Sequence, residues 1–231
     1  MSSKPTIVLV HGAWGDGSHW RHVIPLLHQA GYPVKAVQNP LTSLADDVDR
    51  TRRLAEAQEG PTILVGHSYG GAVISGAGHA ANVIALVYIA AFAPDEGDSL
   101  GGIFGRREAP AGAAIIRPDQ DGFLWLTQDG FHANFSADLD AGEALVMAVA
   151  QKPIAGRCFA DTAGAPAWKA KPSWYQVSSQ DHMIPPATQA EMAAHIGAKK
   201  TITLEASHAS LASHPGEVFA LIEEAAKATA G

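Results

Sequence analysis

The sequence predicts an α/β fold with a mostly parallel six-stranded sheet that is covered by helices on both faces. Two observations predict it. Short apolar runs, many of them β-branched, alternate along the chain with segments whose apolar residues recur at helical spacing. Apolar residues make up 47% of the 231 residues and charged residues 17%, so the chain can bury one large core. The alternation breaks after Pro94, and we expect residues 95–171 to form a helical lid inserted into a core made of residues 1–94 and 172–231.

Six segments are expected to form the strands of this sheet. The first, Thr6–Val10, reads TIVLV without interruption, which is typical of a strand buried on both faces. The others lie at residues 33–37, 62–65, 83–89, 173–177 and 201–204. Most of them precede a helical segment, and repeated β-α units of this kind join parallel strands.

Helix boundaries are predicted from capping and terminating residues. Ser18 is a suitable N-cap for the first helix, in which Pro25 must either mark the first turns or cause a kink. Ser43 is a suitable N-cap for the second helix, and Gly60 would end it. Later helices are expected at residues 69–80, 142–151, 188–196 and 217–228.

Charge and composition exclude several classes of partner. The net charge is −7 and no run of Lys and Arg exceeds two residues, so nucleic acid would be repelled. The longest apolar run, Val83–Ala93, is shorter than the roughly 20 residues that a membrane helix needs, so we expect no membrane partner. Cys158 is the only cysteine, and no pair of histidines has ligand spacing with an accompanying carboxylate, so neither a disulfide nor a metal site is expected. The chain also begins without a secretory leader, and we expect a cytoplasmic protein.

The segment Gly66-His67-Ser68-Tyr69-Gly70-Gly71 carries the clearest chemical signal. It lies where an apolar strand ends and a helix of small residues begins, which is the context of a nucleophile elbow. The glycines leave room for a tight turn that would expose the Ser68 hydroxyl above the sheet. The same pattern also occurs by chance in ordinary β-α turns, but the strand and the helix around it favour Ser68 as a nucleophile. The backbone N–H of Tyr69 would then face the oxyanion.

A serine nucleophile needs a general base and a carboxylate that orients this base. Of the eleven histidines, His208 follows the last strand, and Asp181 follows the strand before it. Because the carboxyl ends of parallel strands meet at one crevice, we expect Ser68, Asp181 and His208 to come together there. The alternative acids, which follow the fourth strand, are Asp95 and Asp98. The alternative bases are His67, His182 and His214.

These motifs, together with His11-Gly12-Ala13-Trp14 after the first strand, resemble the α/β-hydrolase superfamily over nearly the whole chain. Within it, the chain is similar to the branch of small esterases and hydroxynitrile lyases that includes plant methylesterases and cofactor-free bacterial esterases. The resemblance implies an α/β-hydrolase fold that lacks the N-terminal hairpin, a lid that shapes the substrate pocket, and no cofactor. It also implies that the backbone N–H of Ala13, or of a close neighbour, is the second oxyanion donor. His11 would support this loop by hydrogen bonding.

The lid must leave one face towards the cleft, so some of its large side chains are expected to contact substrate. We expect this role for Trp125 and His132 within the lid, and for Trp14, which would border the acyl pocket. An exposed apolar lid would also support a homodimer.

The expected function is that of a carboxylesterase-type serine hydrolase. Ser68 would attack a small apolar ester, His208 would move the proton and Asp181 would orient His208. A lyase that cleaves cyanohydrins or other C–C bonds is an alternative on the same fold. The plant lyases place a lysine beside the catalytic histidine, whereas this chain has Ala209 there, which favours ester hydrolysis. A small-molecule receptor that keeps the triad without catalysis is a third alternative.

Overall fold

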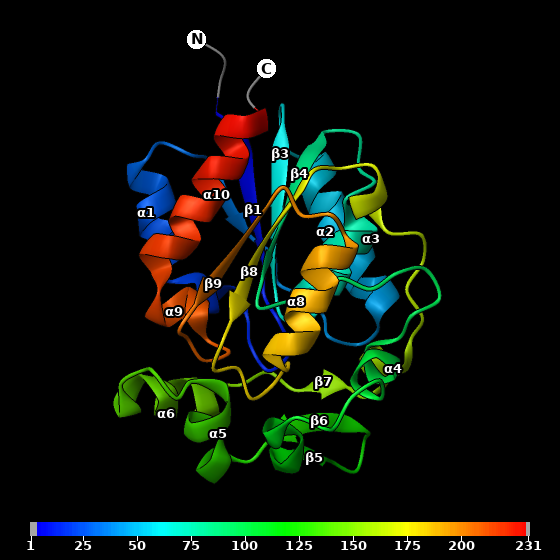
Figure 1. The fold of residues 1–231 in the computed structure, drawn as a ribbon, viewed down its shortest axis with the longest axis vertical. Helices are drawn as coiled ribbons and strands as arrows, with labels where there is room; N and C mark the ends of the chain where they lie inside the picture. Colours follow the sequence, from blue (N-terminus) through cyan, green and yellow to red (C-terminus); the bar gives the residue numbers. More distant parts are fainter. Residues whose placement is uncertain (1–3, 230–231) are drawn as a thin grey trace.

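The computed structural model describes residues 4–229, and its centre is a six-stranded sheet with the strand order β2-β1-β3-β4-β8-β9 (Figure 1). All neighbouring strands in it are parallel. The strands are β1 (Thr6–Val10), β2 (Val34–Ala36), β3 (Thr62–His67), β4 (Val83–Ile89), β8 (Ser173–Ser178) and β9 (Lys200–Leu204). The prediction of a six-stranded parallel sheet is confirmed, and each predicted strand end lies within two residues of the observed one.

Helices cover both faces of the sheet because its strands carry apolar side chains on both sides. In β1, Ile7 points to one face and Val8 to the other, as the two-residue period of a strand requires. The face of Ile7 is covered by α1 (Val23–Gln29) and α10 (Pro215–Thr229). The face of Val8 is covered by α2 (Leu44–Glu56), α3 (Tyr69–Ala77) and α8 (Pro186–His195). Two short turns complete this part of the chain: the 3₁₀ turn η1 (Gly17–Trp20) and α9 (Ser210–Ser213).

The helix starts follow the capping side chains. The Ser43 hydroxyl accepts a hydrogen bond over 3.0 Å from a backbone N–H in the first turn of α2, which confirms Ser43 as the N-cap. The prediction that Ser18 caps the first helix is wrong. Asp16 instead caps η1 by accepting from the N–H of Ser18 at 2.7 Å, and α1 begins only after this turn. Pro25 lies in the first turn of α1, where a backbone N–H has no intrahelical acceptor, so the N–H that proline lacks costs no hydrogen bond.

The chain between β4 and β8 forms an insertion that lies at the carboxyl ends of the parallel strands (Figure 1). Most of the regular structure of the insertion is helical, and it also contains a small antiparallel sheet with the order β5-β6-β7, which the sequence pattern does not predict. These strands have only 3, 4 and 2 residues, too few to produce a recognisable alternation of polar and apolar side chains. The elements of the insertion are α4 (Leu100–Phe104), η2 (Ala111–Ile115), β5 (Ile116–Pro118), β6 (Phe123–Leu126), α5 (Gln128–Phe135), α6 (Ala141–Val149), β7 (Ile154–Ala155), α7 (Arg157–Ala160) and η3 (Ala167–Lys169).

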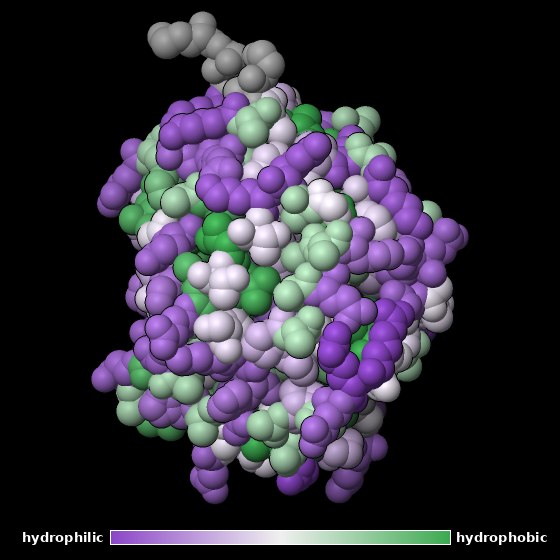
Figure 2. Space-filling model, viewed as in Figure 1, coloured by the Kyte–Doolittle hydropathy of each residue, from purple (hydrophilic) through white to green (hydrophobic). Residues whose placement is uncertain are grey.

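Figure 2 shows that the face in view is covered largely by hydrophilic side chains, with hydrophobic ones confined to small patches. Among the described residues, the exposed large hydrophobic side chains all belong to the insertion: Trp125, Leu145, Val146 and Val149. Within residues 4–229, no helix combines the length and the apolar character needed to cross a membrane.

Candidate active site

Ser68 lies on a strained turn between β3 and α3. Its backbone angles are φ 55° and ψ −123°, a region that residues other than glycine rarely adopt. Hydrogen bonds hold this conformation. The Ser68 carbonyl accepts from the N–H groups of Gly71 and Phe92, both at 3.0 Å, and the Ser68 N–H donates to the Ile89 carbonyl at 3.2 Å. A strained serine held in this way at a strand-to-helix turn has the geometry of a nucleophile elbow.

Ser68, His208 and Asp181 form a continuous hydrogen-bonded chain. Ser68 Oγ lies 2.8 Å from His208 Nε2, and His208 Nδ1 lies 2.7 Å from Asp181 Oδ2. All three side chains are buried. Because an ionised carboxylate can only accept, His208 carries its proton on Nδ1, which leaves Nε2 free to accept the serine proton. This order of nucleophile, base and orienting acid is what general-base activation of a serine requires.

Asp181 is held in place by three further donors. Its Oδ1 accepts from the backbone N–H groups of Met183 at 2.7 Å and Ile184 at 2.9 Å. Its Oδ2 accepts from Gln189 Nε2 at 2.7 Å, in addition to His208. The turn after β8 thus surrounds the carboxylate with donors and aims it at the imidazole. These bonds hold the carboxylate in position beside the imidazole.

The alternative acids lie away from His208. Asp95 Oδ1 pairs with Lys169 Nζ at 2.6 Å, and this hydrogen bond lowers the pKa of Asp95 to about 2. Asp98 pairs with Arg106. Neither carboxylate contacts the imidazole of His208, so the geometry favours the acid on the turn after β8.

The alternative bases do not reach the serine. His67 Nε2 donates to the carbonyl oxygen of His208 at 2.8 Å, and the two rings lie 4.8 Å apart, so His67 packs against the base. His182 Nδ1 lies 3.2 Å from a backbone carbonyl of the insertion, and His214 Nδ1 lies 3.9 Å from Asp138 Oδ2. In the part of the chain that the structure describes, no three His, Cys, Asp or Glu side chains are grouped so that they could hold a metal ion.

The loop after β1 packs directly against the elbow. A Cβ atom on Gly12 would lie 2.7 Å from Ser68 Cβ, and a Cβ atom on Gly70 would lie 2.5 Å from the carbonyl oxygen of Val10. Both distances are shorter than carbon atoms tolerate, so only glycine permits this approach. The glycines of the two motifs are therefore required by the contact between the two segments.

Some backbone N–H groups at this contact have no acceptor among the described residues, and those of Ala13 and Tyr69 are two of them. The N–H groups of Ala13 and Tyr69 donate no hydrogen bond to any residue from 4 to 229. Tyr69 is the first residue of α3, where the N–H has no intrahelical acceptor. Ala13 is buried and is followed by Trp14, which has a positive φ of 58°. Unpaired N–H groups on two segments that meet at a serine are what an oxyanion hole requires.

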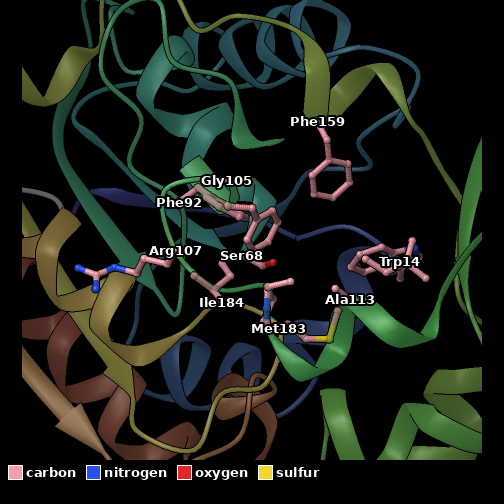
Figure 3. Close-up of a pocket in the computed structure, with 13 residues that line it drawn as sticks. Trp14, Ser68, Phe92, Gly105, Arg107, Ala113, Phe159, Met183 and Ile184 are labelled. Carbon is pink, nitrogen blue, oxygen red and sulfur yellow. The ribbon is translucent and has the colours of Figure 1, made fainter. Parts of the chain in front are cut away.

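A cavity of about 310 Å³ opens beside Ser68 (Figure 3). Its wall is almost entirely apolar. Trp14 and Phe159 stack with their ring centres 5.9 Å apart, and Phe92 and Phe104 meet edge to face at 5.1 Å. The remaining residues of the wall are Gly105, Arg107, Ala109, Pro110, Ala113, Ile116, Met183 and Ile184. A molecule bound here would contact mainly apolar side chains next to the hydroxyl oxygen of Ser68.

Of the three expected substrate contacts, only Trp14 lines this cavity. His132 Nε2 donates to the carbonyl oxygen of Leu139 at 3.0 Å. Trp125 Nε1 donates to Asp119 Oδ2 at 2.9 Å, and its side chain is 37% exposed. His132 and Trp125 do not line this cavity, and each side chain bonds to a partner elsewhere in the insertion.

Sequence reasoning missed most of the cavity wall. Met183 and Ile184 lie in the same loop as Asp181, and this proximity is a signal that could have identified them. Phe92 likewise follows the end of β4. Phe104 and Phe159 come from the insertion, whose path over the sheet no local pattern specifies.

Three features indicate which family the chain belongs to. They are the parallel sheet, the strained elbow, and the order of serine, acid and histidine along the chain. Residues 7–221 match the sequence model of the alpha/beta hydrolase family. The chain belongs to this alpha/beta hydrolase family. The membership that the motifs predict is therefore confirmed.

Named relatives of this alpha/beta hydrolase are hydrolases. It is 37% identical over 107 residues to the carbendazim hydrolyzing esterase of Nocardioides sp. strain SG-4G, across 40% of this chain and 44% of that protein. It is 25% identical over 245 residues to the alpha/beta hydrolase nvfD of Aspergillus novofumigatus, across 96% of this chain and 97% of that protein. The first match thus spans less than half of the esterase.

A solved structure has the same fold. The crystal structure of a pyrethroid hydrolase from Sphingobium faniae JZ-2 matches with a TM-score of 0.83 and 24% identity, over 98% of each chain. At this identity the likeness establishes the fold alone. Evidence for the type of reaction therefore comes from the residues of the site.

Proposed function

We propose that this chain is a serine hydrolase that cleaves small apolar carboxylic esters through an acyl-enzyme. One observation carries the proposal: the hydrogen-bonded chain of Ser68, His208 and Asp181 ends at an apolar cavity. The names of the carbendazim hydrolyzing esterase and the pyrethroid hydrolase support hydrolysis as the class of reaction.

In the first step, Ser68 Oγ attacks the carbonyl carbon of the ester while His208 Nε2 takes the hydroxyl proton. Asp181 stays ionised and stabilises the imidazolium that forms. The N–H groups of Tyr69 and Ala13 donate to the oxyanion, and one such donor typically stabilises the transition state by about 3–4 kcal/mol. His208 then gives its proton to the departing oxygen, which leaves as the alcohol.

Water completes the cycle through the same groups. His208 accepts a proton from a water molecule, whose oxygen attacks the acyl carbon bound to Ser68. When the tetrahedral intermediate collapses, the proton returns to Ser68 Oγ and the carboxylic acid leaves. Each turnover consumes one ester and one water, and releases one alcohol and one acid.

The cavity favours small, uncharged esters. Its volume of about 310 Å³ lies at the lower end of the range for ligand pockets, about 300–1,000 Å³. The charged residue of its wall, Arg107, points away from Ser68 (Figure 3), and its Nη2 donates to Glu191 at 2.6 Å. An acyl chain beside Trp14 and Phe92 would therefore be recognised by the burial of apolar surface.

Hydrolysis of p-nitrophenyl acetate and butyrate by the wild type and by Ser68→Ala tests the proposal. We expect turnover by the wild type and a loss of at least about 10³-fold in the variant, because the nucleophile is gone. Ser75→Ala is the matched control. Ser75 is a buried serine of α3 whose hydroxyl contacts the Gly71 carbonyl at 2.8 Å and the Tyr88 hydroxyl at 2.9 Å, and its variant should remain active.

Other outcomes would reassign the function. Activity that survives in Ser68→Ala would place the nucleophile elsewhere. A wild type that releases cyanide from mandelonitrile but hydrolyses no ester would be a lyase. Tight binding of a small molecule without any turnover would indicate a receptor.

A further inference from the structure

Asn39 holds His11 by two hydrogen bonds. It lies in the loop between β2 and α2 and is buried. Its backbone N–H donates to His11 Nε2 at 3.0 Å, and its side-chain amide donates to the carbonyl oxygen of His11 at 3.2 Å. Two other groups hold Asn39 itself: Thr51 Oγ1 donates to Asn39 Oδ1 at 3.4 Å, and Lys152 Nζ donates to the Asn39 carbonyl oxygen.

These contacts determine the tautomer of His11. Because Nε2 accepts from the N–H of Asn39, the proton of the neutral ring is on Nδ1. Nδ1 therefore donates to the carbonyl oxygen of Gly12, which is 2.8 Å away. Burial lowers the pKa of His11 to about 4, so the ring is neutral near pH 7.

The His11 ring thereby fixes the peptide that joins Gly12 and Ala13. A trans peptide is planar, and its C=O and N–H groups point in opposite directions. Since the Gly12 carbonyl bonds to the His11 ring, the Ala13 N–H points away from that ring. Gly12 itself lies against Ser68, as the 2.7 Å approach of a Cβ atom placed on it demonstrates. The hydrogen bond between the His11 ring and the Gly12 carbonyl thus determines the direction of the Ala13 N–H.

We propose that Asn39 is a positioning residue, whose side-chain amide holds the His11 carbonyl and thereby places the His11 ring that aims the Ala13 N–H at the oxyanion formed on Ser68. This inference rests on the proposed ester hydrolysis. Asn39 is not part of the cavity wall, so its loss should change the stabilisation of the transition state and leave substrate binding nearly intact. Lys152 lies between α6 and β7, so its contact with Asn39 also ties the insertion to the oxyanion loop.

Asn39→Leu tests the inference, because leucine has a similar volume and lacks the amide that holds the His11 carbonyl, while the backbone N–H that bonds to the His11 ring is kept. Asn82→Leu is the matched control. Asn82 Nδ2 donates to the Ala55 carbonyl at 2.7 Å, and the residue precedes β4 at the opposite end of the sheet from Ser68. The wild type and both variants are compared in three measurements: kcat and KM for p-nitrophenyl butyrate, Ki for an alkyl trifluoromethyl ketone, and Tm. The ketone is chosen because it forms an oxyanion adduct with an active-site serine.

We expect Asn39→Leu to lower kcat by about 10- to 100-fold, less than the loss of a whole oxyanion donor. Its KM should stay within about twofold of the wild type, and Ki for the ketone should rise in parallel with the loss of kcat. Asn82→Leu should lower Tm and leave kcat and Ki within about twofold. If Asn39→Leu behaves in the same way as Asn82→Leu, Asn39 is merely structural and the inference is overturned.

A second variant covers the case in which Asn39→Leu does not fold. Lys152 is only half-buried, so Lys152→Met should preserve the core. We expect Ki for the ketone to rise about three- to fivefold while KM is unchanged, and an unchanged Ki would overturn the inference. A wild type without Ser68-dependent turnover would overturn the proposed function as well, whereas a normal kcat in folded Asn39→Leu overturns this inference alone.

Discussion

The hydroxyl of Tyr69 donates a hydrogen bond to the buried carboxylate of Asp47, with 2.6 Å between Tyr69 Oη and Asp47 Oδ2. The other carboxylate oxygen accepts the N–H of Leu41 at 2.8 Å. Burial raises the pKa of Asp47 above its ordinary value, because the site is poor in water. Tyr69, the first residue of α3, is thus anchored to Asp47 of α2, and the buried Asp47 carboxylate is stabilised by the few donors that reach it.

Tyr69→Phe should lower the free energy of unfolding by about 1–3 kcal/mol, because it leaves a buried carboxylate oxygen without its donor. Urea unfolding at pH 7 measures this change. Tyr88→Phe is the control: Tyr88 Oη lies 2.9 Å from Ser75 Oγ in a buried pair without charge, and its loss should cost about 0.5–1.5 kcal/mol. Equal losses in the two variants would mean that the Asp47 carboxylate does not need the Tyr69 hydroxyl.

Asp181→Asn should lower kcat for p-nitrophenyl butyrate by about 10³- to 10⁴-fold with little change of structure. The amide no longer holds the proton of His208 on Nδ1, so Nε2 loses the lone pair that must accept the serine proton. Asp98→Asn is the control, because Asp98 is the rival acid and pairs with Arg106. A large loss in Asp98→Asn together with a small loss in Asp181→Asn would reverse the assignment of the acid.

Three buried histidines should make stability depend on pH. Burial lowers the pKa of His11 to about 4, that of His19 to about 3, and that of His67 well below its ordinary value. In the unfolded chain each of them binds a proton near pH 6.5, whereas the folded protein keeps them neutral. Their contribution is therefore complete above about pH 6.5. As the pH falls from there towards 4, the free energy of unfolding should decrease by up to about 1.4 kcal/mol per pH unit for each histidine.

Urea unfolding at pH 7, 6 and 5 measures this slope. His19→Gln should reduce the slope by about one third, since it removes one of three such groups. His19 suits the test because its Nδ1 has no hydrogen-bond partner among the described residues. His28→Gln, at an exposed position of α1, is the control and should leave the slope unchanged. The same slope in His19→Gln and the wild type would show that the folded protein binds a proton at His19.

Topology explains why Ser68, Asp181 and His208 could be found from the sequence. Each follows a strand with a clear apolar pattern, and the carboxyl ends of parallel strands lie side by side. Ser18 shows where local patterns fail, because Asp16 is an equally good capping residue two positions earlier and the turn formed there. When two nearby residues have equal capping propensity, tertiary contacts decide which of them caps the helix.

Most residues of the cavity wall could not be predicted from the sequence. Trp14 and Phe159 stack although one follows β1 and the other lies in the insertion. His132 is a polar residue among aromatic ones in the insertion, which is typical of a pocket residue. Its ring, however, bonds to the nearby Leu139 carbonyl. Such partners are set by the path of a chain with short, irregular elements, and that path has no periodic signal.

Phe159→Ala should extend the acyl chains that the protein accepts. Phe159 is half-buried and forms part of the cavity wall beside Trp14, so its removal enlarges the cavity. Each methylene that becomes buried contributes about 0.8 kcal/mol, which is about fourfold in kcat/KM. Room for two more methylenes should therefore raise the ratio of kcat/KM for p-nitrophenyl octanoate over butyrate by about 15-fold.

The control for this change is Phe123→Ala. Phe123 is also half-buried in the insertion but lies in β6, outside the cavity wall, so the ratio should stay at the wild-type value. A general loosening of the insertion would change the ratio in both variants, whereas a direct contact changes it only in Phe159→Ala. An unchanged ratio in Phe159→Ala would show that the acyl chain does not extend towards Phe159.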